Sequence, residues 1–285
     1  MHKFLVRAGS GIIYAAVIIA AIVCGGWAVY ALALLFAAIG VCELNHMALG
    51  YSRRLLPVYA ISVLQVMLFI SVFAFTPVLS PLWVYVMTGV FLLLLWPYNL
   101  LLKKARKADS TYADDSDANK APIYGLGYLG IPMAFMVVFP IGRLALLVFA
   151  LLWINDSGAY IVGSLTGRHK LCPSLSPNKT WEGFIGGCLL PILGAFLLDL
   201  YCDSFFGMAL YPLWVWMLIG VLTCIFGTLG DLLESKIKRF YGAKDSGHWI
   251  PGHGGILDRI DSFLLAYPVV AIVLALIYLI YAKPI

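Results

Sequence analysis

Long apolar runs, separated by short polar stretches, dominate this chain of 285 residues. A helix that crosses a bilayer needs about 20 mostly apolar residues. Nine stretches meet this requirement, and they cover approximately 9–26, 27–45, 56–76, 81–102, 123–141, 142–162, 183–202, 210–233 and 260–281. The pattern therefore predicts an all-α, polytopic integral membrane protein with about nine transmembrane helices.

The composition agrees with this prediction. Hydrophobic residues make up 62% of the chain and charged residues 12%, whereas a soluble protein carries roughly 25% charged residues. The mean hydropathy of +0.95 excludes a disordered chain, a disulfide-stapled secreted module and a soluble enzyme with one central core. The six cysteines are scattered without a C-x-x-C pair, and most lie inside apolar runs, so we expect neither a disulfide framework nor a zinc site.

The N-terminus combines a basic start with an apolar run, as a signal peptide does. It lacks an A-x-A cleavage site, and a second apolar segment follows at once. We therefore expect this segment to be retained as the first helix.

Basic residues indicate the orientation, because Lys and Arg are in excess in cytoplasmic loops. With the N-terminus in the cytoplasm, 17 of the 19 Lys and Arg residues fall on the cytoplasmic side, and only Arg143 and Lys283 fall outside. The polar segments 103–122, 163–182 and 234–259 then all face the cytoplasm. We expect a multi-pass protein of the cell membrane, whose formal charge of +5 reflects this orientation rather than a nucleic-acid partner.

The polar segment 103–122 divides the chain into two predicted domains. It joins a basic cluster to acids, serine and alanine without apolar periodicity, which is typical of a flexible linker whose lysines lie near anionic membrane lipids. Residues 1–122 then form a domain of transmembrane helices ending in this cytoplasmic linker. Residues 123–285 form a C-terminal transmembrane domain, in which the chemically informative polar clusters are found.

The first of these clusters begins where a long apolar run ends in Asp231. A carboxylate at the membrane boundary is costly unless it is paired or coordinated. If the helix continues, Asp231, Glu234 and Lys238 share one face, and Glu234 and Lys238 are spaced for an ion pair. A plain helix-end salt bridge explains the last two residues better than it explains Asp231.

A glycine-containing turn and a second pair of acids follow. Glycines let backbone N–H groups approach an anion closely, and Gly254 and Gly255 stand just before a helix expected to start near residue 256. Asp258 and Asp261 are three residues apart at the start of that helix, so their carboxylates share its cytoplasmic end.

Bases lie between the two acid-bearing helix ends, and they are Lys236, Lys238, Arg239, Lys244 and His253. Carboxylates suit divalent cations and the bases suit polyphosphates, so the combination indicates phosphoryl or nucleotidyl transfer. A solvated charged face is the alternative, and the glycine turn with its paired acids favours the reactive site.

A second polar cluster precedes the helix expected from Gly183. It contains Arg168, His169, Lys170, Ser176, Asn178, Lys179 and Thr180. A helix N-terminus that follows Lys and Thr is suited to phosphate binding. The positive-inside bias also places lysines here, so this cluster alone indicates less than the first.

At this point the residues resemble a known family. The segment SKIKRFYGAKDSGHWIPGHGGILDRID, from Ser235 to Asp261, is similar throughout to the signature of the phosphatidate cytidylyltransferases, also called CDP-diacylglycerol synthases. NDSGAYIVG and SPNKTWEGFIGG resemble two further recurrent stretches of that family, and the likeness covers about residues 120–285. It implies transfer of the cytidylyl group from CTP to phosphatidic acid, with CDP-diacylglycerol and pyrophosphate as products. It further implies Mg²⁺ as cofactor, K⁺ as an optional second ion, and a homodimer.

The resemblance also implies residue roles. The metal ligands would be Asp231 and Asp258, with Asp261 as a further ligand or a support behind them. Lys238, Arg239 and Lys244 would contact phosphates, and His253 would donate to a phosphate from the glycine turn. The substrate-binding set would comprise Ser176, Lys179, Thr180, Ser235, Gly254, Gly255 and Arg259.

Two other functions stay open. A cytidylyltransferase for another lipid phosphate would share these motifs, because apolar grooves read the lipid tails. An ion-coupled transporter would also carry intramembrane acids, but near the bilayer midplane, whereas the acids here cluster at one face. The family that consumes CDP-diacylglycerol carries a D-G-x2-A-R motif, which this chain lacks.

Overall fold

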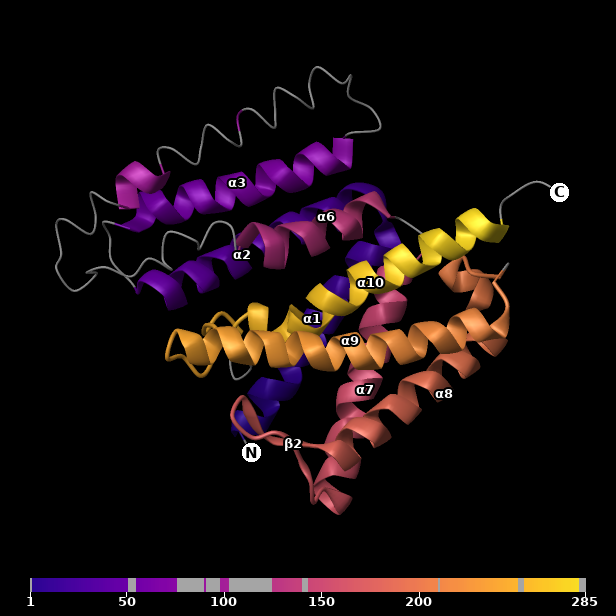
Figure 1. Cartoon of the computed structure of the whole chain (residues 1–285). Helices are drawn as coiled ribbons and strands as arrows, with labels where there is room; N and C mark the ends of the chain where they lie inside the picture. Colours follow the sequence, from indigo (N-terminus) through magenta and orange to yellow (C-terminus); the bar gives the residue numbers. More distant parts are fainter. Residues whose placement is uncertain are drawn as a thin grey trace. The chain divides into compact units, whose positions relative to one another are not determined.

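The computed structural model describes residues 2–50, 55–75, 90, 98–102, 125–139, 143–209, 211–250 and 254–281. Most of these residues form helices, which are joined by loops and one short hairpin (Figure 1). In chain order the elements are α1 (His2–Cys24), α2 (Gly26–Leu49), α3 (Leu56–Phe75), the π-helix η4 (Leu126–Gly130), α6 (Ile131–Val138), α7 (Leu144–Thr166), β1 (Lys170–Cys172), β2 (Ser176–Thr180), α8 (Trp181–Phe206), α9 (Leu213–Phe240) and α10 (Leu257–Tyr281).

Among the described residues, six helices are long and apolar enough to cross a membrane. They are α2, α3, α7, α8, α9 and the Leu257–Leu279 part of α10. The predicted spans 9–26 and 123–141 correspond to shorter apolar helices, Gly9–Cys24 and Leu126–Val138. The prediction of a helical, polytopic membrane protein is confirmed.

Some predictions fall on other parts of the chain. Most of the predicted span 81–102 lies outside the described residues. The linker 103–122 and the domain boundary after residue 122 lie outside them as well. The boundary at 122 and the total of nine helices stay predictions.

The chain forms two compact units. The first unit contains Met1–Val17, Cys24–Val138 and Tyr241–Asp258, and the second contains Ile18–Val23, Phe139–Phe240 and Arg259–Ile285. The division passes through the first turn of α10, so Asp258 belongs to the first unit and Asp261 to the second.

In the first unit, α2 and α3 lie side by side and α6 packs against both (Figure 1). Leu129 of η4 occupies the space left by Gly40 of α2, where an added Cβ would lie 2.9 Å from the leucine side chain. A hydrogen bond also joins α2 to α3, since the hydroxyl oxygens of Tyr30 and Ser71 lie 2.7 Å apart. These contacts position α2, which carries the buried acid Glu43.

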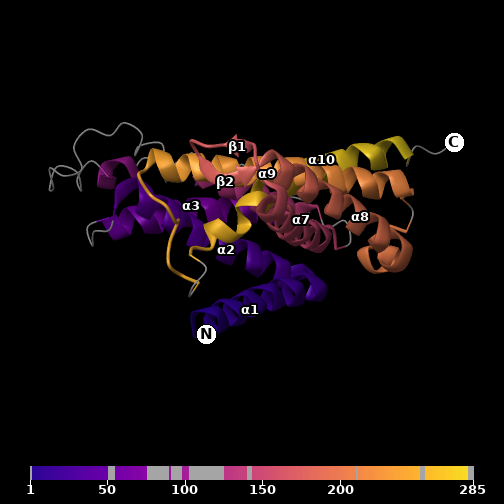
Figure 2. The ribbon, with the colours of Figure 1, turned by 90° about the horizontal axis from the view of Figure 1, so that it is seen from below.

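In the second unit, α7 and α8 form a close pair (Figure 2). Gly183 and Gly187 face α7, and a Cβ at either position would lie 2.9 Å from atoms of Ala159. Small residues four apart let two membrane helices approach until their backbones pack, which replaces the hydrophobic driving force that lipid removes. This pairing fixes the start of α8 beside the end of α7.

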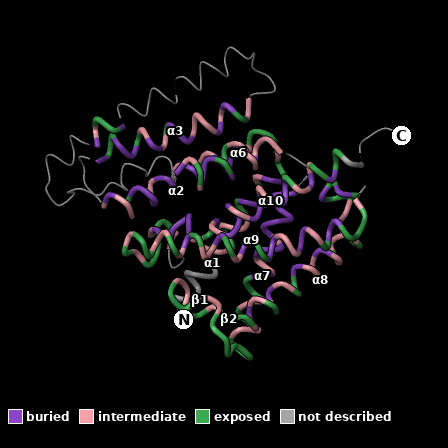
Figure 3. The backbone as a smooth tube through the Cα atoms, in the orientation of Figure 1, coloured by how far each residue is buried: buried purple, intermediate pink, exposed green. Residues whose placement is uncertain are grey.

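One side of α8 carries an exposed apolar stripe. Exposed positions recur along this helix (Figure 3). Ile185, Leu189, Leu193 and Leu197 recur every four residues and are 44–62% exposed. Such a stripe suits contact with lipid tails, which have no polar groups to satisfy. The surface of this helix therefore agrees with the membrane assignment.

The second unit contains a disulfide that the sequence analysis did not predict. Cys188 of α8 is bonded to Cys224 of α9, with their Cα atoms 5.2 Å apart. The sequence analysis expected no disulfide framework, and this bond is an exception to that expectation. The two residues are 36 positions apart inside apolar runs, so only the packing of α8 against α9 brings them together.

Two local differences from the predicted elements matter for the site. α9 continues to Phe240, beyond the predicted end at residue 233, so Asp231, Glu234 and Lys238 lie in one continuous helix. The predicted polar segment 163–182 contains an antiparallel hairpin in which Lys170 is paired with Thr180. The two strands of this hairpin lack a regular alternation of apolar and polar residues, so no strand could be predicted from the pattern.

Candidate active site

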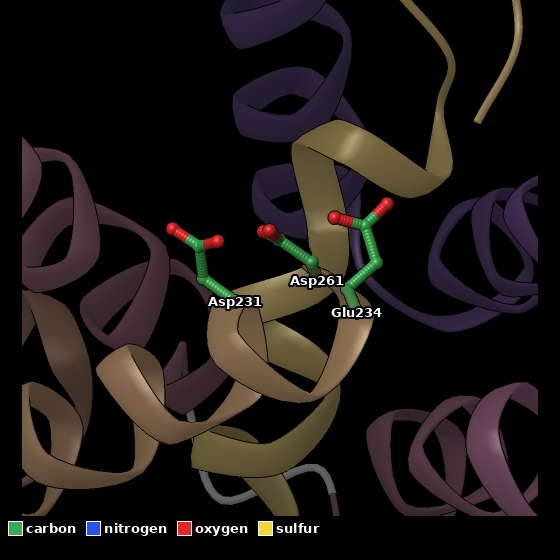
Figure 4. Close-up of side chains that lie close together, drawn as sticks. All are labelled: Asp231, Glu234 and Asp261. Carbon is green, nitrogen blue, oxygen red and sulfur yellow. The ribbon is translucent and has the colours of Figure 1, made fainter. Parts of the chain in front are cut away.

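Three carboxylates gather where α9 and α10 meet. Asp231 and Glu234 come from α9 and Asp261 from α10, and one oxygen of each lies within 4.8 Å of the others (Figure 4). This group is called the acid cluster below. Gly230 permits it, because an added Cβ there would lie 2.7 Å from the carbonyl oxygen of Asp261. The two helix backbones therefore approach closely at the point where the acids project.

Two lysines neutralise part of the acid cluster. The Nζ atom of Lys179 lies 2.5 Å from Oδ2 of Asp231, and the Nζ atom of Lys238 lies 2.6 Å from Oε2 of Glu234. The Glu234 side chain is fully buried, and the Asp231 side chain is 31% exposed. Because a buried carboxylate is costly without a partner, these pairs allow the acids to share one site. The predicted Glu234–Lys238 ion pair is confirmed.

The Lys179 contact also joins the two polar clusters recognised in the sequence. Lys179 belongs to β2, and the hairpin carries it to Asp231 more than fifty positions along the chain. Ser235 donates to Oδ1 of Asp231 at 3.4 Å, and the backbone N–H of Ser262 donates to Oδ1 of Asp261 at 2.6 Å. Neutral donors therefore orient Asp261 and, together with Lys179, Asp231.

The hairpin is held by the start of α8. Thr180 is buried and caps this helix, since its hydroxyl oxygen accepts from the backbone N–H of Gly183 at 3.1 Å. Glu182 accepts from the backbone of Arg168 at 3.1 Å, and its Oε1 lies 2.6 Å from Nδ1 of His169. Ser176 begins β2 and is partly buried. Thr180 thus supports the position of Lys179 from within the helix cap.

Asp258 lies in a second polar group, within the first unit. Its carboxylate accepts from the backbone N–H groups of Ser246 at 3.0 Å and Gly255 at 2.9 Å. The hydroxyl of Ser246 accepts in return from the N–H of Asp258 at 3.3 Å. Gly254 has a φ of +81°, which glycine adopts without strain, and a Cβ there would lie 2.6 Å from the Asp258 carboxylate. The loop therefore closes around this side chain.

The remaining predicted site residues are more exposed or lie elsewhere. Arg239 and Lys244 are exposed around the end of α9, and Arg259 is exposed in the first turn of α10. His253 lies outside the described residues.

Sequence reasoning missed Glu43. It is 2% exposed in α2, and it accepts hydrogen bonds from Ser246, Ile256 and Leu257. The available signal was a single acid within 24 otherwise mostly apolar residues, because an acid inside a membrane segment is a functional candidate by default. Glu234 was recognised as a partner of Lys238 but not as a member of the acid cluster.

The acid cluster fits a magnesium ion by donor type and spacing. Mg²⁺ prefers oxygen ligands at about 2.1 Å in an octahedron, which places neighbouring oxygens roughly 3–4 Å apart. The carboxylate oxygens of the cluster, within 4.8 Å of one another, need only small shifts to meet this geometry. The adjacent ammonium groups of Lys179 and Lys238 suit phosphate oxygens. The arrangement can bind a divalent cation and a polyphosphate together.

Several curated proteins with similar sequences are named phosphatidate cytidylyltransferases. The chain is 47% identical over 132 residues to the phosphatidate cytidylyltransferase of Staphylococcus epidermidis, covering 46% of this chain and 49% of the relative. The Staphylococcus saprophyticus enzyme of the same name is 43% identical over 154 residues, and the Staphylococcus aureus enzyme 42% over 156 residues, each alignment covering 53% of this chain and 57% of the relative. The aligned region spans about half the length of these curated relatives.

A family model extends the match to nearly the whole chain. The model described as the cytidylyltransferase family covers residues 5–277, which include the acid cluster, the Lys179 hairpin and Glu43. The family resemblance found in the sequence motifs is therefore confirmed, and this chain belongs to the cytidylyltransferase family.

Proposed function

We propose that this chain transfers the cytidylyl group of CTP to the phosphate of phosphatidic acid, producing CDP-diacylglycerol and pyrophosphate. The observation that carries the proposal is the acid cluster with its two paired lysines, in a helical membrane protein of the cytidylyltransferase family. The names of the staphylococcal relatives support the choice of phosphatidate as the lipid substrate.

The reaction needs charge neutralisation more than an activated nucleophile. A phosphate oxygen of phosphatidate attacks the α-phosphorus of CTP, the bond from that phosphorus to the bridging oxygen breaks, and pyrophosphate leaves with the bonding electron pair. A phosphate monoester is largely ionised at neutral pH and is already an adequate nucleophile. No Ser, Cys or His nucleophile is required, and repulsion between the anionic substrates is the main obstacle.

In this proposal, carboxylates hold the metal and bases hold the phosphates. The sequence resemblance assigns Asp231 and Asp258 as metal ligands, with Asp261 in support. Within the second unit, Asp231, Glu234 and Asp261 would hold the metal. Bound Mg²⁺ would supply positive charge and Lewis-acid polarisation at the phosphates. The phosphate-binding bases are Lys179, Lys238, Arg239, Lys244 and His253. K⁺ and the homodimer stay predictions.

Lys179 and Lys238 can serve in two ionic arrangements. Without substrate they balance Asp231 and Glu234. With a cation held by the carboxylates, each ammonium group would be available to a phosphate oxygen, where a charge-assisted hydrogen bond is stronger than a neutral one. The ion pairs thus balance the charge of Asp231 and Glu234 when substrate is absent.

The basic residues also support an orientation in which the N-terminus and the acid cluster face the cytoplasm, where CTP is present. This places all three polar segments on the side that carries 17 of the 19 Lys and Arg residues. The same orientation makes the membrane leaflet that contains the substrate lipid accessible from the site.

The central test uses purified protein in detergent with α-labelled CTP and phosphatidate. We expect label to enter a lipid product and pyrophosphate to form in equal amount, and we expect both to stop with EDTA and resume with excess Mg²⁺. Hydrolysis of CTP without a lipid product would contradict the proposal. Product formed faster from an isoprenoid-linked lipid phosphate than from phosphatidate would reassign the lipid substrate.

Replacing the metal ligands gives a second prediction. Asp231→Asn and Asp258→Asn should each remove nearly all turnover, because an amide keeps the shape of the side chain but lacks the charge that a metal needs. The variants should still melt cooperatively, and turnover should be normalised to folded protein. The control is Asp199→Asn, which should keep the wild-type rate. Asp199 lies near the C-terminal end of α8, whereas the Lys179 hairpin adjoins the N-terminal end of this helix. Wild-type turnover in either variant at saturating Mg²⁺ removes that residue from the metal site.

Lys179 gives a third prediction. Lys179→Ala should lower kcat/KM for CTP roughly ten- to a hundredfold, because a charge-assisted hydrogen bond to phosphate is worth about 1.5–3 kcal/mol. Lys179→Arg should restore only part of this loss, since a planar fork replaces a compact charge. If Lys179 only neutralises Asp231, alanine should leave the KM for CTP unchanged and tighten Mg²⁺ binding. Measuring kcat, both substrate KM values and the Mg²⁺ dependence separates these results.

Orientation is tested by labelling in intact cells. A cysteine introduced at Ser204 should react with an impermeant thiol reagent, whereas one introduced at Ser110 should react only after the membrane is permeabilised. The cytoplasmic placement of the segment 103–122 is the reason for this difference. The reverse labelling pattern would overturn the orientation, and unsubstituted protein supplies the background signal.

A further inference from the structure

Glu43 is a buried acid that the chemistry described above does not use. It stands in the C-terminal half of α2 and is 2% exposed. Its carboxylate accepts from the Ser246 hydroxyl at 3.0 Å, the Ile256 N–H at 2.9 Å and the Leu257 N–H at 2.8 Å. All three donors are neutral and come from the segment that leads into α10.

The loop is shaped to surround this carboxylate. An added Cβ at Gly247 or at Gly255 would lie 2.6 Å from Oε1 of Glu43. Any larger residue at these positions would move either the loop or the acid. Gly247 and Gly255 therefore both lie against the Glu43 carboxylate. This buried side chain determines the path of the loop that contains the two glycines.

Glu43 is linked to Asp258 through one hydroxyl group. Ser246 donates its O–H to Glu43, and the same oxygen accepts from the N–H of Asp258 at 3.3 Å. The N–H of Ser246 donates to Oδ2 of Asp258 at 3.0 Å. Moving the Glu43 carboxylate would therefore move both the backbone and the carboxylate of Asp258.

The surroundings of Glu43 favour a negatively charged carboxylate. Its partners include backbone N–H groups at the start of α10, and the N-terminal end of a helix favours an anion. A carboxylate offers two accepting oxygens to the three donors, whereas an amide offers one and turns N–H groups toward the remaining donors. Glutamine is therefore nearly isosteric with glutamate at this position but cannot make the same bonds.

From these contacts we infer that Glu43 is a positioning residue. It sets the backbone at the start of α10 and, through Ser246, orients Asp258. Its effect on catalysis rests on the proposed function, in which Asp258 and Asp261 serve the metal. The positioning itself rests only on the contacts within the first unit.

The test is Glu43→Gln in the full-length, detergent-purified protein, with two readouts. In the cytidylyl transfer assay we expect kcat to fall at least tenfold and the Mg²⁺ concentration for half-maximal rate to rise several-fold, with the KM for phosphatidate unchanged. In hydrogen exchange we expect peptides covering 244–258 to exchange at least tenfold faster, while α8 and α9 stay protected. A smaller active fraction would lower the rate without altering the Mg²⁺ dependence.

Gln65→Leu is the matched control. Gln65 is a polar residue of α3 that is 2% exposed in the same unit, so the substitution also removes a buried polar group. It should leave the kinetic constants and the exchange of 244–258 at wild-type values. A second variant, Ser246→Ala, removes the bridging hydroxyl, and Glu43→Gln combined with Ser246→Ala should lose no more activity than the worse single variant.

Several results would overturn the inference. Unchanged kcat and Mg²⁺ dependence in Glu43→Gln would do so, and so would faster exchange spread evenly over all helices with a lowered melting temperature. If Glu43→Gln does not fold, a wild-type Mg²⁺ dependence in Ser246→Ala overturns the inference instead. A wild-type protein that makes no CDP-diacylglycerol refutes the proposed function, and the exchange of 244–258 then still decides whether Glu43 positions the loop.

Discussion

The cost of placing a carboxylate among apolar helices governs this structure. A charged group removed from water must find an opposite charge or several hydrogen-bond donors, or its burial destabilises the fold. Asp231 and Glu234 meet the requirement with lysines, and Glu43 meets it with N–H and O–H groups. Each solution ties together segments that are distant in sequence, so satisfying the acids also determines how the polar segments are arranged.

The two kinds of compensation have different chemical uses. A lysine side chain paired with a carboxylate can change its partner by rotation about its own bonds, so the contacts of the acid cluster can rearrange without moving the backbone. Backbone N–H groups cannot move away without altering the start of a helix. Glu43 and Asp258 are bound by such groups and therefore form the fixed part of the polar framework.

Periodicity along one helix was readable from the sequence, and contacts between distant segments were not. The face shared by Asp231, Glu234 and Lys238 follows from helical spacing alone, and the apolar runs located the helices to within several residues. The bond from Ser246 to Glu43 spans 203 positions. Lys179 reaches Asp231 through a hairpin without hydrophobic alternation, and Cys188 and Cys224 each lie within an apolar stretch of a helix. In each of these cases, packing rather than local pattern brings the residues together.

The absence of a side chain at Gly230 determines how closely the acid cluster can gather. Its missing side chain lets α9 and α10 approach until the carbonyl oxygen of Asp261 would lie 2.7 Å from a Cβ. The separation of these helices sets the span between carboxylates on opposite sides of the acid cluster. A side chain at position 230 would push α10 away from α9 and move Asp261 away from Asp231 and Glu234. The compactness of the acid cluster therefore depends on a backbone position that contributes no side chain to it.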